Sequence, residues 1–404
     1  MPNFSDQGAD LSQIFITEYN MIDRYVTTGS LWTWGKNYSG QLGDNTRVDK
    51  SSPVQTISLG TNWKQISAGP CTAAIKTDGT LWIWGQAVFG QIGDNTTAAK
   101  SSPVQTAAGG TNWKQVSTGT AHVAAIKTDG TLWLWGQGTY GQIGNNSPLN
   151  RSSPVQTAAS GTNWQQVATG TAHCAAIKTD GTLWVWGDNS YGQLGDDTRD
   201  NKSSPIQTIS GGTNWKQVSA GRVNTAAIKT DGTLWTWGNN GYWQLATGTQ
   251  VSRSSPAQTV SATTNWKSVS VGASFMAAIK TNGTLWLWGD GNSGQLGNGV
   301  AARQSSPVQT VSGGTNWKQV SAGGHSFTTA IKTDGTLWTW GDNSLAQLGD
   351  NTLAAKLSPV QTAAGGTNWK QVSAAPGVGL LASGGVSSAA AIYFYDAGDL
   401  YPSK

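Results

Sequence analysis

The chain is poor in charged residues, and histidine and cysteine are scarcer still. Of its 404 residues only 11% are Asp, Glu, Lys or Arg, against about 25% in a typical soluble domain. The three His and two Cys are too few and too scattered for the clustered ligands of a metal site, so no metal and no cofactor is expected. No stretch approaches the roughly 18 apolar residues of a membrane helix. Residues 1–20 also lack the basic start and apolar core of a secretory signal.

The low charge also limits the partners. The net charge is +4, and no run of Lys and Arg resembles a nuclear signal or a nucleic-acid arm, so nucleic acid is not an expected partner. Ser, Thr, Asn and Gln must cover much of the surface instead. We take this uncharged polar exterior to favour a virion or cell-surface setting, which a chain without a signal would reach by another route such as lysis.

Tryptophan is abundant, and its spacing defines a repeat. The phrase Leu-Trp-x-Trp-Gly occurs seven times at intervals of 50 to 52 residues, and Thr-Asn-Trp keeps the same interval. A period near fifty residues indicates one structural unit that is repeated. Only Trp243 of the 22 Trp lies outside the pattern. The first Trp of each phrase is Trp32, Trp82, Trp133, Trp184, Trp235, Trp286 or Trp338.

One copy of the repeat predicts four short antiparallel strands. Residues 63–68 and 73–77 are apolar or mixed runs, and Asp78-Gly79 after them is a favoured two-residue hairpin turn. Residues 80–84 are rich in β-branched and aromatic side chains, which suits a third strand. Residues 103–106 begin with Pro, which fits an outer strand. Because the third strand has bulky apolar groups on both faces, it indicates a propeller blade covered on both sides by neighbours.

The two ends of the repeat region look like complementary fragments of one blade. The last copy supplies Trp369 but no later Leu-Trp-x-Trp-Gly, and the first copy has only a weak second strand at residues 25–30. Residues 379–385 also align with that second strand, so either terminus could supply it. We therefore expect an all-β, closed seven-bladed propeller whose N- and C-terminal strands share a blade. Closure pairs the strand edges that an incomplete blade would leave free, and free edges invite aggregation.

Four motifs give the repeat a family resemblance. They are Leu-Trp-x-Trp-Gly, then Gly-Gln-Leu-Gly as at residues 40–43, then Ser-Pro-Val-Gln as at residues 52–55, and a Gly-x-x-His element appears at residues 119–122 and 170–173. Over residues 22–385 the chain resembles the regulator of chromosome condensation repeat family, in the Trp-rich form of bacterial and bacteriophage proteins. The resemblance implies a closed seven-bladed propeller that binds other macromolecules. The founding member's exchange activity on a small GTPase is not carried over, because no basic arm or wedge loop is present.

No arrangement of residues predicts catalysis. His122 and His173 occupy the same position in adjacent copies, which favours packing, and no spacing suggests a nucleophile with a base. Cys71 and Cys174 lie two repeats apart, too far for a disulfide, so two free packed thiols are expected. The Asp-Asn-Thr tripeptides, as at Asp44, supply too few carboxylates for calcium and are expected to be turns. We expect no enzyme.

Two sets of residues are candidate contact surfaces. The position two before Gln-Leu or Gln-Ile is aromatic in four consecutive copies, and Trp243 follows the last of them; such an arc suits protein or glycan contact, unless each ring packs on its own loop. A basic residue precedes Ser-Ser-Pro or Leu-Ser-Pro in six copies; the alternatives are a basic rim for an acidic partner or a solvated charge that protects the edge strand. The arc is Phe89, Tyr140, Tyr191, Tyr242 and Trp243, and the rim is Lys50, Lys100, Arg151, Lys202, Arg253 and Lys356.

These observations give one domain with short flanking segments. We assign residues 1–21 to an N-terminal arm, 22–385 to the propeller and 386–404 to a C-terminal tail. The expected function is a non-enzymatic structural or binding module, such as a virion or appendage component that contacts proteins or glycans. The alternative is an intracellular regulator that binds a small GTPase or another protein. Partner identity and copy number are not encoded in the repeat.

Overall fold

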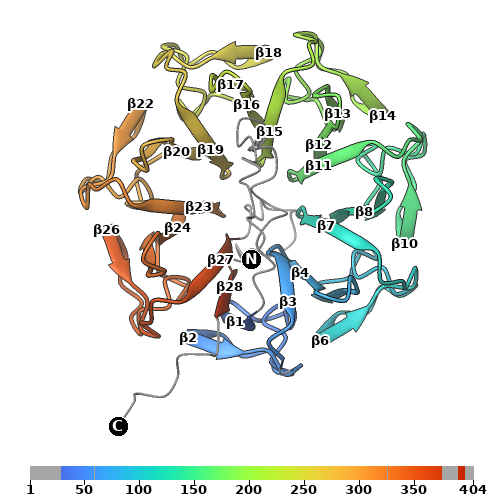
Figure 1. Cartoon of the computed structure of the whole chain (residues 1–404), viewed down its shortest axis with the longest axis horizontal. Helices are drawn as coiled ribbons and strands as arrows, with labels where there is room; N and C mark the ends of the chain where they lie inside the picture. The colour runs from blue at the N-terminus through green and yellow to red at the C-terminus, as the bar shows by residue number, and fades with distance from the viewer. Residues whose placement is uncertain (1–28, 59, 325, 375–389, 396–404) are drawn as a thin grey trace, which may run out of the picture.

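The computed structural model describes residues 29–58, 60–324, 326–374 and 390–395. In this part of the chain, seven four-stranded antiparallel sheets stand as blades around a central axis (Figure 1). The predicted all-β propeller with four-stranded blades is therefore confirmed. Within each blade but the closing one, the strands follow chain order from the axis outward, so strands that are consecutive in sequence pair with each other.

Four sets of strands make up the wheel. The inner strands are β3 (Trp63–Ser67), β7 (Trp113–Thr118), β11 (Trp164–Thr169), β15 (Trp215–Ala220), β19 (Trp266–Val271), β23 (Trp317–Gly323) and β27 (Trp369–Ala374). The second strands are β4 (Cys71–Lys76), β8 (His122–Lys127), β12 (His173–Lys178), β16 (Asn224–Lys229), β20 (Phe275–Lys280), β24 (Phe327–Lys332) and β28 (Ala390–Tyr395). The third strands are β1 (Ser30–Gly35), β5 (Leu81–Gly85), β9 (Leu132–Gly136), β13 (Leu183–Gly187), β17 (Leu234–Gly238), β21 (Leu285–Gly289) and β25 (Leu337–Gly341). The outer strands are β2 (Lys50–Gln55), β6 (Lys100–Gln105), β10 (Arg151–Gln156), β14 (Lys202–Gln207), β18 (Arg253–Gln258), β22 (Gln304–Gln309) and β26 (Lys356–Gln361).

The turn between the second and third strands is the one that the sequence predicts. Gly79 has φ +78°, and its N–H donates to the carbonyl of Lys76. The side chain of Asp78 accepts both the N–H and the hydroxyl of Thr80, which closes the turn on itself. The outer strand is longer than predicted because it begins at Lys100, three residues before Pro103, with an irregularity in its pairing with β5.

Two faces of the disc follow from this order. We call the side with the second-to-third strand turns and the links between blades the hairpin face. The side with the connections from inner to second strand and from third to outer strand is the loop face. Inner strands run from the hairpin face to the loop face, because they begin at the links between blades.

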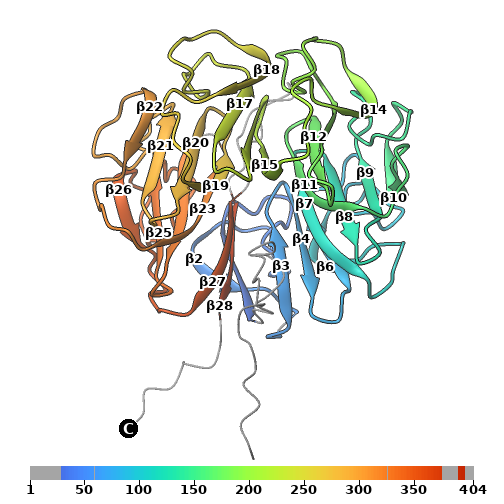
Figure 2. The same cartoon turned by 45° about the horizontal axis from the view of Figure 1, so that its top comes forward.

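The closing blade joins the two ends of the chain, in the order β2, β1, β28 and β27. β1 pairs antiparallel with β28, and β28 pairs antiparallel with β27, so blue and red strands lie side by side (Figure 2). The predicted sharing of a blade is confirmed, and the C-terminus supplies the second strand. This strand comes from residues assigned to a C-terminal tail, so that boundary was wrong. The alternative second strands, residues 25–30 and 379–385, lie largely outside the described residues.

The apolar core lies between the blades. One buried cluster combines Ile75 of β4 and Ile83 of β5 with Trp113 of β7 and Trp135 of β9 in the next blade. The indoles of Trp113 and Trp135 meet edge to face with ring centroids 6.3 Å apart, a favoured aromatic geometry. The two-sided bulk of each third strand is therefore explained by burial against a neighbour on either side.

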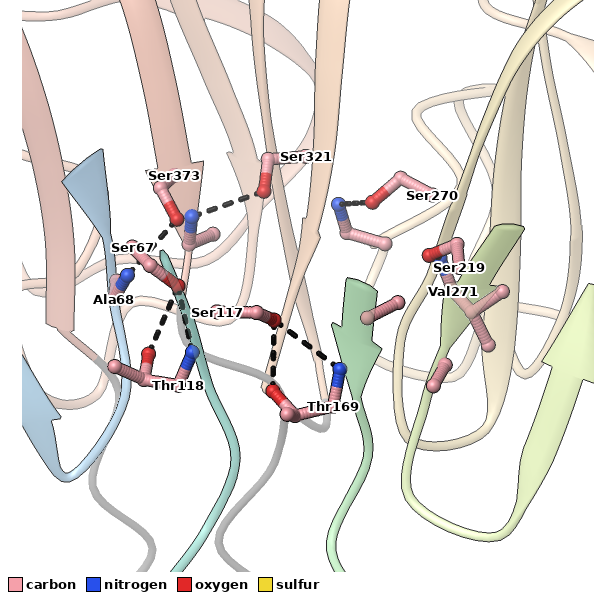
Figure 3. Close-up of a pocket in the computed structure, with 14 residues that line it drawn as sticks. Ser67, Ala68, Ser117, Thr118, Thr169, Ser219, Ser270, Val271, Ser321 and Ser373 are labelled. Atoms are coloured by element: carbon pink, nitrogen blue, oxygen red, sulfur yellow. Dashed lines mark hydrogen bonds between the residues drawn. The ribbon is translucent and has the colours of Figure 1, made fainter. Parts of the chain in front are cut away.

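Polar side chains join the inner strands around the axis. Gln65 donates its amide N–H to the carbonyl of Val116 in the next blade and accepts the N–H of the same residue, at 2.9 and 2.8 Å. Further along the same strand, Ser67 accepts the N–H of Thr118, as Ser117 does for Thr169 in the following blade (Figure 3). Ser373 closes this ladder by accepting the N–H of Ala68 across the joined ends.

Candidate functional surface

The loop face is organised by the Gly-Gln-Leu/Ile-Gly motif, which acts as a junction between blades. The carbonyl of Gln41 accepts the indole N–H of Trp84 from the next blade at 2.9 Å and the hydroxyl of Thr72 at 2.8 Å. Gly43, at φ +68°, lies against that indole, and a β carbon there would be 2.6 Å from its Nε1. The same junction recurs in all seven copies. The paired residues are Trp34 with Gln347, Trp84 with Gln41, Trp135 with Gln91, Trp186 with Gln142, Trp237 with Gln193, Trp288 with Gln244 and Trp340 with Gln295.

The side chain of the same Gln holds the position of the aromatic arc. Gln142 Oε1 accepts the backbone N–H of Tyr140 at 2.8 Å, and the equivalent Gln does so in every copy. The backbone is thus tied to its own loop while the side chain projects from it. Tyr140, Tyr191 and Tyr242 are 41, 44 and 40% exposed, whereas Phe89 is half-buried. Three predicted arc residues therefore lie exposed on adjacent blades.

Trp243 changes the shape of its loop. It has φ +65° at a position that is Gly in most copies; at the equivalent Gly192, a β carbon would be 2.6 Å from Cα of Ser254 in the next outer strand. In that copy Asp197 donates its N–H to the carbonyl of Ser254, and within the described residues the Trp243 copy makes no such bond to its neighbour. Trp243 is half-buried and Ala246 replaces the second Gly, so this loop keeps the Gln244 junction to the next blade but differs from the other copies in sequence and backbone contacts.

A cleft with a volume of about 360 Å³ opens beside this altered loop. Side chains from four successive blades line it, and two arc tyrosines are among them. Tyrosine rings and a few polar groups line it together, a combination that binding pockets share. Its lining includes Tyr191, Arg222, Asn239, Tyr242, Ser274 and Asp290.

The charged groups of the cleft are not equivalent. Asp290 lies 3.7 Å from Nε of Arg303, whose guanidinium sits 4.7 Å from the centre of the Tyr242 ring. Tyr242 therefore packs against a cation of the next blade as well as lining the cleft. Arg222 is half-buried and makes no ion pair or hydrogen bond with any other described residue. The cleft consequently offers one uncommitted guanidinium beside two tyrosines.

Sequence reasoning did not single out Arg222, although a signal was present. It stands in the Gly-x-x-His position as Gly221-Arg222-Val223-Asn224, where the corresponding residues of the two preceding copies are Thr120 and Thr171. A charged residue at a repeat position that is otherwise uncharged is a candidate functional residue. The repeated residues are explained by the shared structure, whereas the exception is not.

The predicted basic rim is largely neutralised. Lys50, on β2, pairs with Asp44 of its own loop at 3.5 Å. Burial raises the pKa of Asp44, but the hydrogen bonds from Thr46 and Asn37 and the charge of Lys50 together hold it below its usual value. Where the Asp is replaced, as by Asn145, Thr247 and Asn298, the Lys becomes Arg151, Arg253 and Gln304. The paired rim residues are Lys50 with Asp44, Lys100 with Asp94, Lys202 with Asp196 and Lys356 with Asp350.

Tertiary packing creates a Cys–His pair that spacing did not suggest. Cys174 Sγ lies 3.1 Å from His122 Nε2 of the preceding blade, and both residues are fully buried. Burial raises the pKa of Cys174 well above its usual value and, with a smaller contribution from His173, lowers the pKa of His122 to about 3. An active thiolate needs the opposite shifts. The pair is therefore a packing contact, and Cys71 is likewise a free, buried thiol.

The Gly of the Gly-x-x-His element makes room for this packing. A β carbon at Gly119 would lie 2.6 Å from Cε1 of His122, and one at Gly170 would lie 2.3 Å from Cε1 of His173. His173 Nε2 contacts the hydroxyl of Thr225 at 3.0 Å. Since Thr225 donates its own proton to Gln193, His173 is the donor to Thr225.

The lysines of the second strands have a structural role on the hairpin face. Lys178 Nζ lies 4.7 Å from the ring centre of Trp164 and 4.2 Å from that of Trp184, between the two indoles. Trp184 in turn donates its indole N–H to Thr182 of the turn. This cation–π clamp recurs at Lys76, Lys127, Lys178, Lys229, Lys280 and Lys332.

Two features are absent from the part of the chain that the structure describes. No group of three or more His, Cys, Asp or Glu side chains lies close enough together there to hold a metal ion. Over the same residues, no helix has the length and apolar character that crossing a bilayer demands.

Comparison with known proteins places the chain in a family. The model of the RCC1-like domain matches residues 24–326, and two models of the regulator of chromosome condensation (RCC1) repeat match residues 317–347 and 334–378. The ultraviolet-B receptor UVR8 of Arabidopsis thaliana is 31% identical over 81% of this chain and 64% of the receptor. The E3 ubiquitin-protein ligase HERC2 of Homo sapiens is 28% identical over 83% of this chain and 7% of the ligase. The chain thus spans less than two thirds of these relatives.

Solved structures share the architecture. Human WBSCR16 superposes with a TM-score of 0.78 at 20% identity, covering 91% of this chain and all of that one. Prp20p of Saccharomyces cerevisiae, a protein with binding properties toward Gsp1p and histones, gives 0.79 at 16% identity and 93% coverage of both chains. These likenesses show the fold, and the domain model that matches most of the sequence shows the kinship: the chain belongs to the regulator of chromosome condensation (RCC1) repeat family.

Proposed function

We propose that the chain is a non-enzymatic, protein-binding propeller that engages a regulatory partner through its loop face. The observation that carries this proposal is the cleft in which Tyr191 and Tyr242, both about two-fifths exposed, flank the uncommitted Arg222. Tyr and Arg are the side chains most enriched at the energetic centres of protein interfaces. A rigid frame holds them in place, because each tyrosine backbone is tied to its own loop.

The regulator hypothesis has more support than the virion hypothesis. HERC2 is a ubiquitin-protein ligase, and Prp20p has binding properties toward Gsp1p and histones. The regulator hypothesis names a small GTPase as a partner, so a small GTPase is the first partner class to test. A virion or cell-surface location rests on the low-charge composition alone and draws no support from the comparisons. Glycan contact through the arc rests only on its exposed aromatic rings.

The proposal is tested with purified small GTPases and with cross-linking in extract, followed by mapping of the cross-links. The double variant Tyr191→Ala/Tyr242→Ala should weaken binding at least tenfold, about 1.4 kcal/mol or more. Tyr38→Ala is the matched control, since Tyr38 is a comparably exposed tyrosine, 43%, on the loop of another blade and outside the cleft. Equal binding by the double variant would place the interface elsewhere, and a failure to cross-link to any protein would contradict the protein-binding function itself.

A further inference from the structure

A set of lysines lies on the inner strands, on the hairpin face and away from the cleft. The residue after the Trp that begins each inner strand is Lys in six blades and Gln in the seventh. Neither the family motifs nor the cleft uses these residues. They are Lys64, Lys114, Gln165, Lys216, Lys267, Lys318 and Lys370.

The fold places these residues on strands around one axis. The inner strands encircle the centre of the wheel (Figure 1). Gln65, the residue after Lys64, forms two hydrogen bonds with the backbone of Val116 in the next blade. The inner strands that carry neighbouring lysines are therefore hydrogen-bonded to each other near those lysines. Burial, followed by the charges of Lys370 and Lys267, lowers the pKa of Lys318.

Among the described residues, five of these lysines have no carboxylate partner. The rim lysines on the outer strands have Asp partners at 3.2 to 3.5 Å. On the inner strands, in contrast, most of the lysines form no ion pair with any carboxylate of the described residues. The Asp side chains of the hairpin turns are near the clamp lysines instead: hydrogen bonds from Thr80 and, to a smaller extent, the charge of Lys76 lower the pKa of Asp78. The inner-strand lysines without such a pair are Lys64, Lys216, Lys267, Lys318 and Lys370.

We propose that these five lysines, the axial lysine ring, form a binding site for a compact polyphosphate, a small molecule that carries several phosphate groups. A Lys ammonium binds phosphate as a point charge on a flexible stem, and a ring of them raises the local concentration of anions. Like charges held around one axis repel each other, and a multivalent anion at the centre relieves that repulsion at every position. A duplex nucleic acid would instead need charges spread along a stripe to follow its backbone.

The probe is myo-inositol hexakisphosphate, titrated calorimetrically into the full chain at about 0.15 M salt, where long-range attraction is screened. The triple variant Lys267→Gln/Lys318→Gln/Lys370→Gln should weaken binding at least tenfold. Gln is the natural residue at position 165 of the same ring, so the strands accept it, and the unliganded variant should melt no lower than wild type. The control Lys100→Gln/Lys202→Gln/Lys356→Gln removes the same charge from the rim and should bind within twofold of wild type.

A gain of function provides the second arm. Gln165→Lys completes the ring and should tighten binding two- to threefold, which a loss of folding cannot imitate. The proposal is overturned if wild type does not bind the probe at this salt concentration, or if the rim variant loses as much affinity as the ring variant. It is also overturned if short duplex DNA binds more tightly than the probe through the same lysines, which would make the ring a nucleic-acid surface.

Discussion

The indole Nε1 of Trp34 donates a 3.1 Å hydrogen bond to the backbone carbonyl of Gln347, 313 residues later in the chain. The same bond joins Trp135 to Gln91 inside the repeat, where the two residues are 44 apart. One local motif therefore serves both as an ordinary junction and as the closure of the wheel. The chain needs no special closing motif on this side, because its first third strand and its last loop meet as any two neighbours do.

Replacing Trp34 by Phe should destabilise the protein by about 1–3 kcal/mol, because a buried carbonyl loses its donor and the smaller ring leaves a void. Trp34 is fully buried. Urea denaturation followed by circular dichroism measures the change. Trp82→Phe is the control: its partly buried indole bonds only within its own blade, to Thr80, and a smaller loss is expected. Equal losses for both would contradict the importance of the junction between blades.

The serine ladder has one gap, and filling it should stabilise the wheel. Ser219 accepts the N–H of Val271 at 3.1 Å, but Ala168 stands in the equivalent position opposite Ala220. Ala168→Ser should therefore raise the free energy of unfolding by up to about 1 kcal/mol, the usual net value of such a bond. Ser219→Ala is the reverse experiment and should lower it by a similar amount. A drop in the urea midpoint for Ala168→Ser would show that the hydroxyl has no room.

Stability should fall as the pH falls from about 6.5 towards 5. Burial lowers the pKa of His122 to about 3 and that of His173 to about 4, whereas both titrate near 6.5 in the unfolded chain. Below 6.5 the unfolded state thus binds more protons, which favours unfolding by about 1.4 kcal/mol per pH unit for each His. The full contribution is present above 6.5 and is lost as the pH approaches the folded values.

Denaturation midpoints at pH 7, 6 and 5 test this dependence. The double variant His122→Asn/His173→Asn is chosen because Asn224 is the natural residue at the same position of the next blade, and its stability should change less over this range. Carboxylates such as Asp44 and Asp94 affect the stability only at more acidic pH, because their pKa is lowered in the folded protein. An equally steep slope in the double variant would assign the effect to other groups.

The clamp lysines should stabilise the fold through cation–π contacts with the indole faces and not through hydrogen bonds. Lys178→Gln is expected to cost about 1–2 kcal/mol, because the ammonium lies between Trp164 and Trp184 at cation–π distances. Lys178→Arg keeps the charge over both rings and should retain most of the stability. Lys216→Gln, on the inner strand, is the control and should be close to neutral. A neutral Lys178→Gln would show that the lysine merely fills space.

Much of the architecture follows from the spacing of a few residue types. The interval between Trp pairs indicated seven units, Asp78-Gly79 indicated the hairpin, and bulk on both faces of the third strand indicated blades. The incomplete first and last copies indicated a shared blade. The identity of its second strand could not be predicted, since β28 (Ala390–Tyr395) does not carry the repeat sequence, and pairing with β1 and β27 alone selects it.

The sequence by itself determined the fold and the positions of Tyr140, Tyr191 and Tyr242, because repetition turns a local pattern into a symmetric wheel. Only the tertiary structure decided which charges are free. Lys50 is paired because its own loop places Asp44 within reach, and Arg222 is left uncommitted because Asp290 of the same cleft pairs with Arg303 instead. Cys174 is a packing residue because the fold buries it against His122 of the neighbouring blade, and this burial raises its pKa. Contacts between blades depend on distances in space, and these cannot be read from the spacing of residues along the chain.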